Sequence, residues 1–271
     1  MGNAEKVKVE RIPVDERGSM LGLVTLNRPD EMNPFDWDTG IRVRELFKEL
    51  AEDDVVRVVA VTGSGKAFSA GGDMEKYRDL QRDPVGFPQF LEDMHAGFTM
   101  ISEQPKPFIA LVNGVSVAGG TELILSCDFA IAARSARIGD AHLPFGQMGG
   151  GGVLTLLPRA IGPARARELI FSGRLLSADE ALEWGLVTKV VDDDQLLQAG
   201  IAFAAEVAKK SPLAIANAKR VLNAALWNGT GVYEGLRLER EVTARYCLTS
   251  EDAPEGLEAF AAKRPPQFVG R

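Results

Sequence analysis

FIALVNGVSVAGGTELILSCD, residues 108–128, joins an apolar segment to a run of small residues and then to a helix-like segment. The apolar start, Phe108–Val112, predicts a buried strand, and the small residues predict a turn into a helix. Glycines at a helix start let a ligand approach the backbone, where unpaired N–H groups point outward. A developing oxyanion could therefore lie beside Gly119.

Glu122 lies in the first turn of that expected helix and is followed by Leu123–Leu125. Apolar surroundings raise the pKa of a carboxyl group toward the range in which it works as an acid or base. Glu122 is therefore a candidate catalytic residue. The alternative is a carboxylate that only interacts favourably with the helix dipole.

A second segment repeats the arrangement. Residues 55–62 (VVRVVAVT) predict a buried strand, and residues 63–74 (GSGKAFSAGGDM) follow as a glycine-rich loop and a helix start. Two such turns in one domain could supply two N–H donors to one oxygen, which is what an oxyanion hole requires.

These two loops, with motifs spread over nearly the whole chain, resemble the enoyl-CoA hydratase/isomerase (crotonase) superfamily. The matching motifs are Asn27-Arg28-Pro29 with Asn33, then 67–74, Asn113-Gly114 with 119–123, Ser172-Gly173-Arg174 with Ala178, Ala181 and 185–187, and Glu255-Gly256 with Phe260 and Lys263-Arg264-Pro265. The resemblance implies a spiral of ββα turns and an acyl-CoA substrate that reacts through a thioester enolate.

The resemblance also assigns roles to particular residues. The N–H groups of Gly72 and Gly119 would form the oxyanion hole, and Glu122 and His142 would be the catalytic side chains. Met32, Lys66, Ala70, Asp73, Met74 and Lys263 would contact the substrate or its CoA part, with Lys66 and Lys263 or Arg264 near the CoA phosphates. The chemistry needs no redox cofactor, because coenzyme A is part of the substrate.

His142 departs from the family pattern. Hydratases of this superfamily usually carry a second glutamate at the aligned position, where two carboxylates position water and deliver a proton to the α-carbon. Histidine exchanges protons near neutral pH, so acid–base chemistry stays available. Superfamily members that cleave carbon–carbon bonds in cyclic diketones place a histidine in a similar setting, and here the pattern is Asp140-Ala141-His142-Leu143-Pro144. Asp140 is the candidate to orient the imidazole, and a structural histidine is the alternative.

Three functions follow. The first is an enoyl-CoA hydratase or related lyase or isomerase. The second is a hydrolase on the same scaffold that uses His142 on a thioester or a carbon–carbon bond. The third is a catalytically silent oligomer that binds acyl-CoA or a protein partner.

Composition excludes several other classes. The 271 residues carry a net charge of −7, which argues against binding to a nucleic-acid backbone. The two histidines, His95 and His142, lie in no metal-ligand cluster, so we expect no metal site. The run 149–152 is four glycines without the spacing of a dinucleotide fingerprint.

The sequence also predicts where the protein is found. The two cysteines, Cys127 and Cys247, favour a reducing compartment over a disulfide framework, and Cys127 is expected in the core. We find no signal peptide and no apolar run of the roughly 20 residues that span a bilayer. We therefore expect a cytoplasmic protein without membrane contact.

Alternating strands and helices predict an α/β core at 1–192 and a helical region at 193–271. The expected strands are 7–10, 21–26, 55–62, 108–112, 129–133 and 188–191. The expected helices of the core are 36–53, 87–103, 120–127 and 153–161, and the capping pattern at Ser177 opens another. Ser211-Pro212 opens a helix in the tail.

The tail is expected to form an oligomer interface, because it carries more apolar residues than one short domain face requires. These are Ile201, Phe203, Val207, Leu213, Ile215, Val221, Leu222 and Leu226. We predict a homotrimer or hexamer.

Residues 79–88 resemble the family's variable loop beside the acyl pocket.

Overall fold

A six-stranded sheet forms the centre of the molecule in the computed structural model, which describes residues 5–271. Its strands run in the order β1-β2-β3-β5-β7-β10. They span β1 (Val7–Pro13), β2 (Met20–Leu26), β3 (Val56–Gly63), β5 (Phe108–Val112), β7 (Phe129–Ala133) and β10 (Lys189–Val191). Only β1 pairs antiparallel, and the other pairs are parallel.

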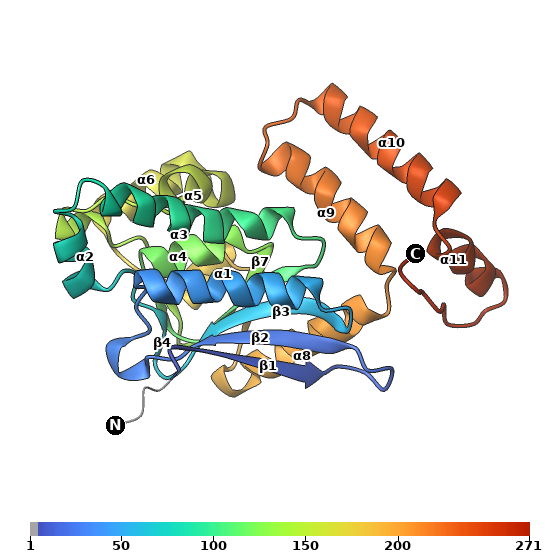
Figure 1. Cartoon of the computed structure of the whole chain (residues 1–271), viewed down its shortest axis with the longest axis horizontal. Coiled ribbons are helices and arrows are strands. Elements are labelled where there is room, and N and C mark those ends of the chain that lie inside the picture. Colours follow the sequence, from blue (N-terminus) through green and yellow to red (C-terminus); the bar gives the residue numbers. More distant parts are fainter. Residues whose placement is uncertain (1–4) are drawn as a thin grey trace.

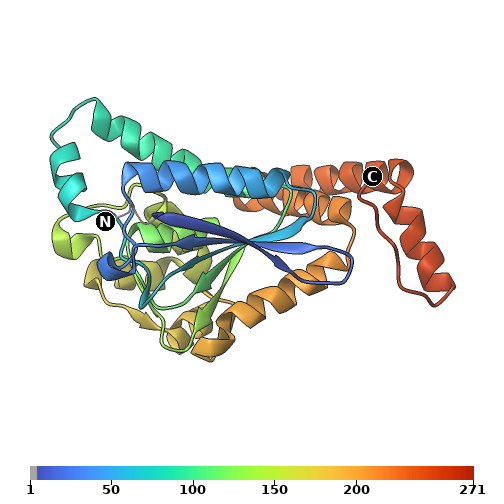
Figure 2. The ribbon, with the colours of Figure 1, turned by 60° about the horizontal axis from the view of Figure 1, so that its bottom comes forward.

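Helices cover both faces of this sheet (Figures 1 and 2). One face packs against α1 (Trp37–Glu52), α3 (Gly86–Glu103) and α4 (Gly119–Ser126), and the other packs against α8 (Leu196–Ala208). Alternate strand residues serve the two cores: Val59 and Val61 face the first, and Val58 and Ala60 face the second. Burial on both faces explains why these strands read as continuous apolar runs.

A second, smaller sheet adds one short strand after each of three main strands. Its members are β4 (Ala67–Ser69), β6 (Val115–Ser116), β8 (Arg137–Ile138) and β9 (Leu176–Ser177), in that order. The sequence β3-β4-α2 and the sequence β5-β6-α4 are therefore two ββα turns of one spiral, as the resemblance implied. The short strands were not predicted.

The remaining core helices surround this spiral. They are α2 (Met74–Leu80), α5 (Val153–Ile161), α6 (Pro163–Ser172) and α7 (Ala178–Trp184). The predicted cap at Ser177 is confirmed: its hydroxyl accepts from the N–H of Glu180, and the Glu180 carboxylate accepts from the N–H of Ser177. The segment expected as a variable loop at 79–88 contains the end of α2, a turn and the start of α3.

The C-terminal helices α9 (Pro212–Leu226), α10 (Val232–Thr249) and α11 (Asp252–Ala261) project from one end of the molecule (Figures 1 and 2). The predicted boundary at residue 192 needs adjustment, because α8 packs on the sheet and belongs to the core. Ile201, Phe203, Val207 and Ile215 of the expected interface are packed in that core.

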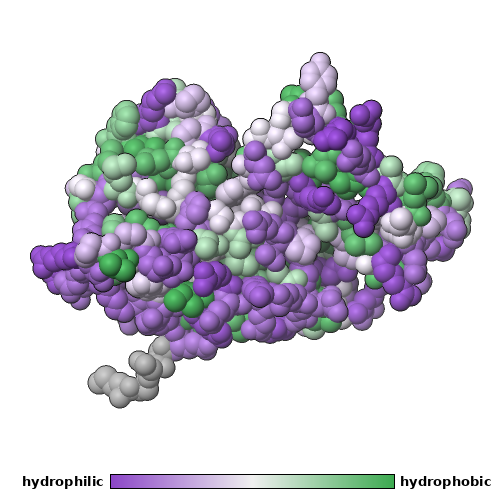
Figure 3. Space-filling model, turned by 45° about the horizontal axis from the view of Figure 1, so that its top comes forward, coloured by the Kyte–Doolittle hydropathy of each residue, from purple (hydrophilic) through white to green (hydrophobic). Residues whose placement is uncertain are grey.

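Other apolar side chains of the projecting helices are exposed, and Figure 3 shows green patches on this arm. We call them the arm patch: Leu222, Leu226, Val232, Tyr233, Leu236, Leu248, Leu257 and Phe260. Within residues 5–271, none of the helices has the length and apolar character needed to cross a bilayer.

An ion pair between a buried lysine and a partly exposed aspartate connects the arm to the core. Lys219 of α9 is 8% exposed; its ammonium lies 2.7 Å from Asp128 Oδ2 and donates to the carbonyl of Lys106. Asp128 Oδ2 also accepts from the N–H of Phe108, at the start of β5. One carboxylate thus connects α9 to the central sheet.

We expect Lys219→Met to lower the free energy of unfolding by roughly 1 to 3 kcal/mol, because it leaves the partly exposed carboxylate of Asp128 without its cation. Urea unfolding followed by circular dichroism measures the change. Lys209→Met is the matched control, since the Lys209–Glu206 pair is exposed, and it should leave the midpoint almost unmoved. Equal effects of the two substitutions would show that Lys219 does not anchor the arm.

Candidate active site

The short sheet aligns the functional residues. Its parallel register pairs Ser69 with Ser116, and Ser116 with Ile138. The carboxyl ends of β4, β6 and β8 therefore lie at one edge, the place where ligands bind in parallel sheets. Gly72 follows β4, Gly119 follows β6, and Asp140 and His142 follow β8, so three separate segments converge there.

Two backbone N–H groups remain free at this edge. The N–H groups beside them are engaged: Asp73 donates to the carbonyl of Phe35 at 2.8 Å, and Ala118 donates to the carbonyl of Asp140 at 2.7 Å. Across the part of the chain that the structure describes, no hydrogen bond uses the N–H of Gly72 or Gly119. Both residues line the same pocket. An oxyanion hole requires both groups to donate to one substrate oxygen, and this role of Gly72 and Gly119 stays a prediction.

The two loops meet at a contact that only glycine permits. A β-carbon on Gly71, whose φ is +84°, would lie 2.6 Å from the β-carbon of Ala118. Ala118 itself has φ 49° and ψ −122°, a conformation that non-glycine residues rarely adopt. Backbone strain of this kind concentrates at functional sites. Here it turns the chain so that Gly119 opens α4 toward the pocket.

Glu122 extends from α4 into the same pocket and is only 4% exposed. Its Oε1 accepts from the N–H of Gly151 at 2.8 Å and from the N–H of Val153 at 3.3 Å. Burial raises the pKa of Glu122, against the opposing effects of His142 and these hydrogen bonds. The carboxyl group is therefore suited to exchange a proton nearer neutral pH.

The glycine run 149–152 has a role that the sequence did not reveal. A β-carbon on Gly151 would lie 2.6 Å from Oε2 of Glu122. A side chain there would displace the carboxylate that the Gly151 N–H holds. The only available signal was the run itself, which has no recognisable spacing.

His142 stands opposite Glu122 and is held by Asp140. Its Nδ1 lies 2.6 Å from Oδ1 of Asp140, a fully buried carboxylate. The second oxygen of Asp140 has no hydrogen-bond partner among residues 5–271. Burial alone would lower the pKa of His142, but the hydrogen bond and charge of Asp140, with the charge of Glu122, outweigh it and raise the pKa. Because Asp140 engages Nδ1, Nε2 is the nitrogen left for chemistry.

These groups share one cavity of about 350 Å³, which we call the acyl pocket. A β-carbon on Gly149 would lie 3.0 Å from Oε1 of Glu122 and 3.4 Å from Cε1 of His142, so both side chains flank one point. The wall is mainly apolar: Phe35, Ala70, Met74, Tyr77, Phe90, Leu91, Met94, Phe98, Val117, Ala118, Ala141 and Phe145, with Gln147 and Gly150 at the other side. A mainly apolar wall of this kind suits an acyl chain.

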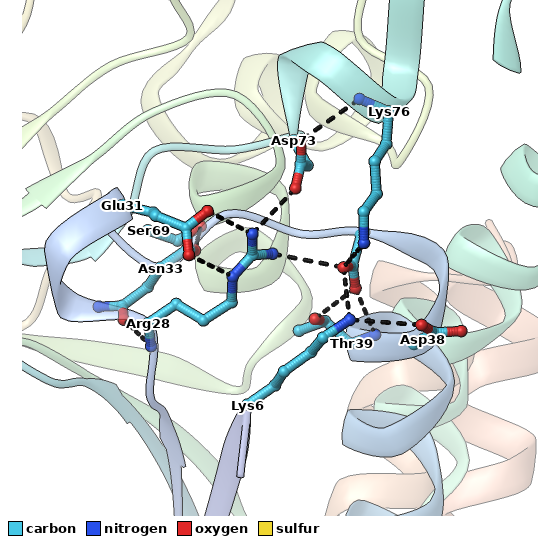
Figure 4. A network of polar contacts seen from close by, with 10 residues as sticks. Lys6, Arg28, Glu31, Asn33, Asp38, Thr39, Ser69, Asp73 and Lys76 are labelled. Carbon is cyan, nitrogen blue, oxygen red and sulfur yellow. Dashed lines mark hydrogen bonds and ion pairs between the residues drawn. The ribbon is translucent and has the colours of Figure 1, made fainter. Parts of the chain in front are cut away.

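A polar network supports the first loop from outside (Figure 4). The side chain of Asp36 is 2% exposed. Its Oδ2 lies 2.7 Å from the ammonium of Lys6, 2.5 Å from that of Lys76 and 3.4 Å from the guanidinium of Arg28. Burial opposes ionisation, but the two lysines outweigh it and hold the pKa of Asp36 well below its usual range. Arg28 also contacts Asp73 at 3.0 Å, directly after Gly72. The network therefore ties the Gly72 loop to the start of α1.

The other predicted contact residues are placed unevenly. Ala70 and Met74 line the acyl pocket, whereas Asp73 lies behind it, in contact with Arg28. Met32 and Lys66 are exposed on neighbouring loops and are not part of the pocket wall. Lys263 lies after α11, in the projecting arm, and Figure 1 shows α11 and α2 at opposite ends of the molecule. A role for these three in CoA binding stays a prediction.

We expect Asp140→Asn to lower the pKa of His142 more than Glu122→Gln does. Asp140 raises this pKa through both a hydrogen bond and its charge, whereas Glu122 acts through charge alone. Proton NMR titration measures it directly, because the chain has only two histidines and few imidazole signals have to be assigned. An unchanged His142 titration in Asp140→Asn would mean that the pair does not form in solution.

Comparison with known proteins agrees with this geometry. The family model for enoyl-CoA hydratase/isomerase matches residues 16–271. A probable enoyl-CoA hydratase from Rhizobium meliloti (strain 1021) is 37% identical and covers 97% of this chain and 99% of its own. The 1,2-epoxyphenylacetyl-CoA isomerase of Escherichia coli (strain K12) is 36% identical, with coverages of 94% and 97%.

Solved structures match over the full length as well. The crystal structure of enoyl-CoA hydratase from Bacillus anthracis superposes with a TM-score of 0.89 at 32% identity, covering 98% of this chain and all of the other. The predicted superfamily and fold are thereby confirmed. This chain belongs to the enoyl-CoA hydratase/isomerase family and is an enzyme with hydratase- or isomerase-like activity on acyl-CoA.

Proposed function

We propose that this enzyme adds water reversibly to a 2-enoyl-CoA through a thioester enolate. The observation that supports it is the convergence of four groups on one apolar pocket: the free N–H groups of Gly72 and Gly119, the buried carboxyl of Glu122 and the imidazole of His142. Sequence similarity does not distinguish hydration from isomerisation, because a probable hydratase and an isomerase are almost equally similar to this chain.

In this mechanism the two N–H groups bind the thioester oxygen and stabilise the negative charge that develops on it. Glu122 takes a proton from water as the hydroxide adds to the β-carbon. The imidazolium of His142 then gives its Nε2 proton to the α-carbon of the enolate. The product is a 3-hydroxyacyl-CoA, and a proton passed from Glu122 to His142 restores the starting state.

No metal or redox cofactor enters this proposal. The N–H pair polarises the thioester carbonyl, which makes the β-carbon of the substrate electrophilic, and water is the only co-reactant. CoA is part of the substrate, and we propose that Lys66 contacts its phosphates, while Met32, Ala70 and Met74 border its pantetheine arm. Asp73, behind the acyl pocket, would act only by holding the Gly72 loop through Arg28. Lys263 would contribute from the arm of a neighbouring subunit.

One observation favours a second candidate, a hydrolase. The buried Asp140–His142 pair is the arrangement that activates water or a nucleophile in many hydrolases. A hydrolase acting on a thioester would release free CoA thiol, whereas hydration would not. A screen over 2-enoyl, 3-enoyl and 3-keto CoA thioesters separates the reactions. Hydration removes the absorbance of a 2-enoyl thioester, isomerisation of a 3-enoyl thioester produces it, and a thiol reagent detects thioester hydrolysis. CoA thioesters that bind without any turnover would instead indicate the silent binding protein.

We also propose that the enzyme is a homotrimer or hexamer that works in the cytoplasm. The arm patch supports the assembly, because exposed apolar areas of this kind usually mark interfaces. Both cysteines are free, with Cys127 buried and Cys247 exposed, which suits a reducing compartment.

Glu122→Gln should reduce turnover of crotonyl-CoA by roughly 10² to 10⁴-fold, because it keeps the shape but removes the proton acceptor. Calorimetry should still detect acyl-CoA binding, with no signal for NAD.

In the wild type, kcat/KM should rise with pH as Glu122 loses its proton and fall as His142 loses its own. The midpoint of each limb should lie at a higher pH than the ordinary pKa of a carboxyl group or an imidazole, because the pKa values of Glu122 and His142 are both raised.

Substitutions of His142 provide the comparison. His142→Ala should lower turnover strongly and remove the limb at high pH. His142→Glu restores a two-carboxylate site and should raise hydration of crotonyl-CoA above the wild-type rate. If neither substitution changes the rate, His142 is structural and Glu122 acts alone.

Light scattering at micromolar concentration should give three or six times the chain mass of 29.2 kDa. Introducing a charge into the arm patch with Leu226→Glu should shift the protein toward smaller species. Val85→Glu is the matched control and should leave the assembly intact, because Val85 is an exposed apolar residue outside the arm. A monomeric wild type would refute the proposed assembly.

A further inference from the structure

A second cavity of about 230 Å³ adjoins the acyl pocket, between the start of α1, α2 and α3. We call it the α2 cavity. Trp37 and Leu80 form its apolar side, and Asp36 and Lys76 form part of its polar rim. It contains none of the groups that we assign to catalysis.

The two cavities share one wall. Phe35, Tyr77 and Phe90 line both of them. These three aromatic side chains are therefore what separates the acyl pocket from the α2 cavity. The volume available to an acyl chain depends on whether this wall is closed.

Phe35 and Phe90 are fixed parts of the wall. Both are buried; Phe35 packs edge-on against Phe98, and Phe90 packs edge-on against Trp37. The backbone of Phe35 is also held by two hydrogen bonds, from its N–H to Gly71 and from the N–H of Asp73 to its carbonyl. Neither side chain can be removed without disturbing the oxyanion loop or the core.

Tyr77 is the residue of this wall whose side chain can be replaced without disturbing the core. It is half-buried and comes from α2, a helix of seven residues with no buried member. Its ring packs edge-on against Phe87 at 5.3 Å and Phe90 at 6.0 Å. Burial and the charge of Glu122 raise the pKa of Tyr77, so the phenol stays neutral beside the acyl pocket.

We propose that Tyr77 sets the upper limit of acyl-chain length by closing the acyl pocket against the α2 cavity. The wild-type enzyme then prefers short to medium apolar acyl chains. Removing the ring joins the cavities and gives a long chain room beside Trp37 and Leu80. The inference rests on the proposed function only in placing the acyl group in the acyl pocket.

The test compares kcat/KM for crotonyl-, octenoyl- and hexadecenoyl-CoA. Tyr77→Ala should raise the ratio of hexadecenoyl- to crotonyl-CoA by about tenfold or more, since even one extra methylene is discriminated by about 10-fold or more. Tyr77→Phe keeps the ring and should keep the wild-type ratio. Arg78→Ala, at the neighbouring exposed position of α2, controls for disturbance of the helix.

A ratio that is the same in Tyr77→Ala and the wild type would overturn the inference, as would an equal change in Arg78→Ala. Tyr77→Leu replaces Tyr77→Ala if the latter does not fold, and the same increase is expected. If the wild type turns over no enoyl-CoA, the proposed function fails, but the inference is still tested by calorimetry. Butyryl-, octanoyl- and palmitoyl-CoA are then the probes, and tighter relative binding of palmitoyl-CoA by Tyr77→Ala supports the proposal, whereas an unchanged order refutes it.

Discussion

Parallel pairing of three very short strands is the interaction on which the site depends. β4, β6 and β8 each contribute two or three residues, yet their register places Gly72, Gly119 and His142 at one edge. A slip of one residue in such a ladder turns every side chain to the opposite face. It would also redirect the N–H groups of Gly72 and Gly119, which bind one oxygen in the proposed mechanism. The catalytic geometry is therefore set by register more than by any single side chain.

Strands this short need help from outside the ladder. Asn33 and Asn113 supply it by donating to the carbonyl of Ala67 at 2.8 and 3.2 Å. Asn113 also accepts from the N–H of Gly63, and Thr121 donates to the carbonyl of Gly139 at 2.7 Å. These side chains occupy backbone groups that the short strands leave free. Asn33 and Asn113, which the sequence offered only as family motifs, have a direct physical role here.

The sequence predicted most of the long elements, because apolar periodicity and caps act locally, but it did not predict the ten-residue helix α6. The strands at 108–112 and 129–133 and the helix at 153–161 have the predicted bounds. β4, β6, β8 and β9 escaped prediction, since two or three residues carry no period and their stability comes from partners distant in sequence.

The site divides in the same way. Gly72, Gly119, Glu122 and His142 were predicted from loop motifs, and all four line the acyl pocket. The apolar wall from α2 and α3 was not predicted, because which faces of these helices meet depends on tertiary packing. The same reason hides Gly151, whose N–H reaches Glu122 across 29 residues.

His142 and Asp140 have to be considered as one unit. Asp140 is fully buried and one of its oxygens has no partner among the described residues, so an isolated charge there would be costly. The imidazolium offsets that charge, and in return Asp140 favours the protonated ring. In the proposed reaction, this contact favours His142 as the proton donor and leaves the task of proton acceptor to Glu122. In a site with two glutamates, two groups of the same kind share the roles of proton donor and acceptor, whereas in the proposed mechanism the Asp140 contact assigns these roles to different kinds of residue.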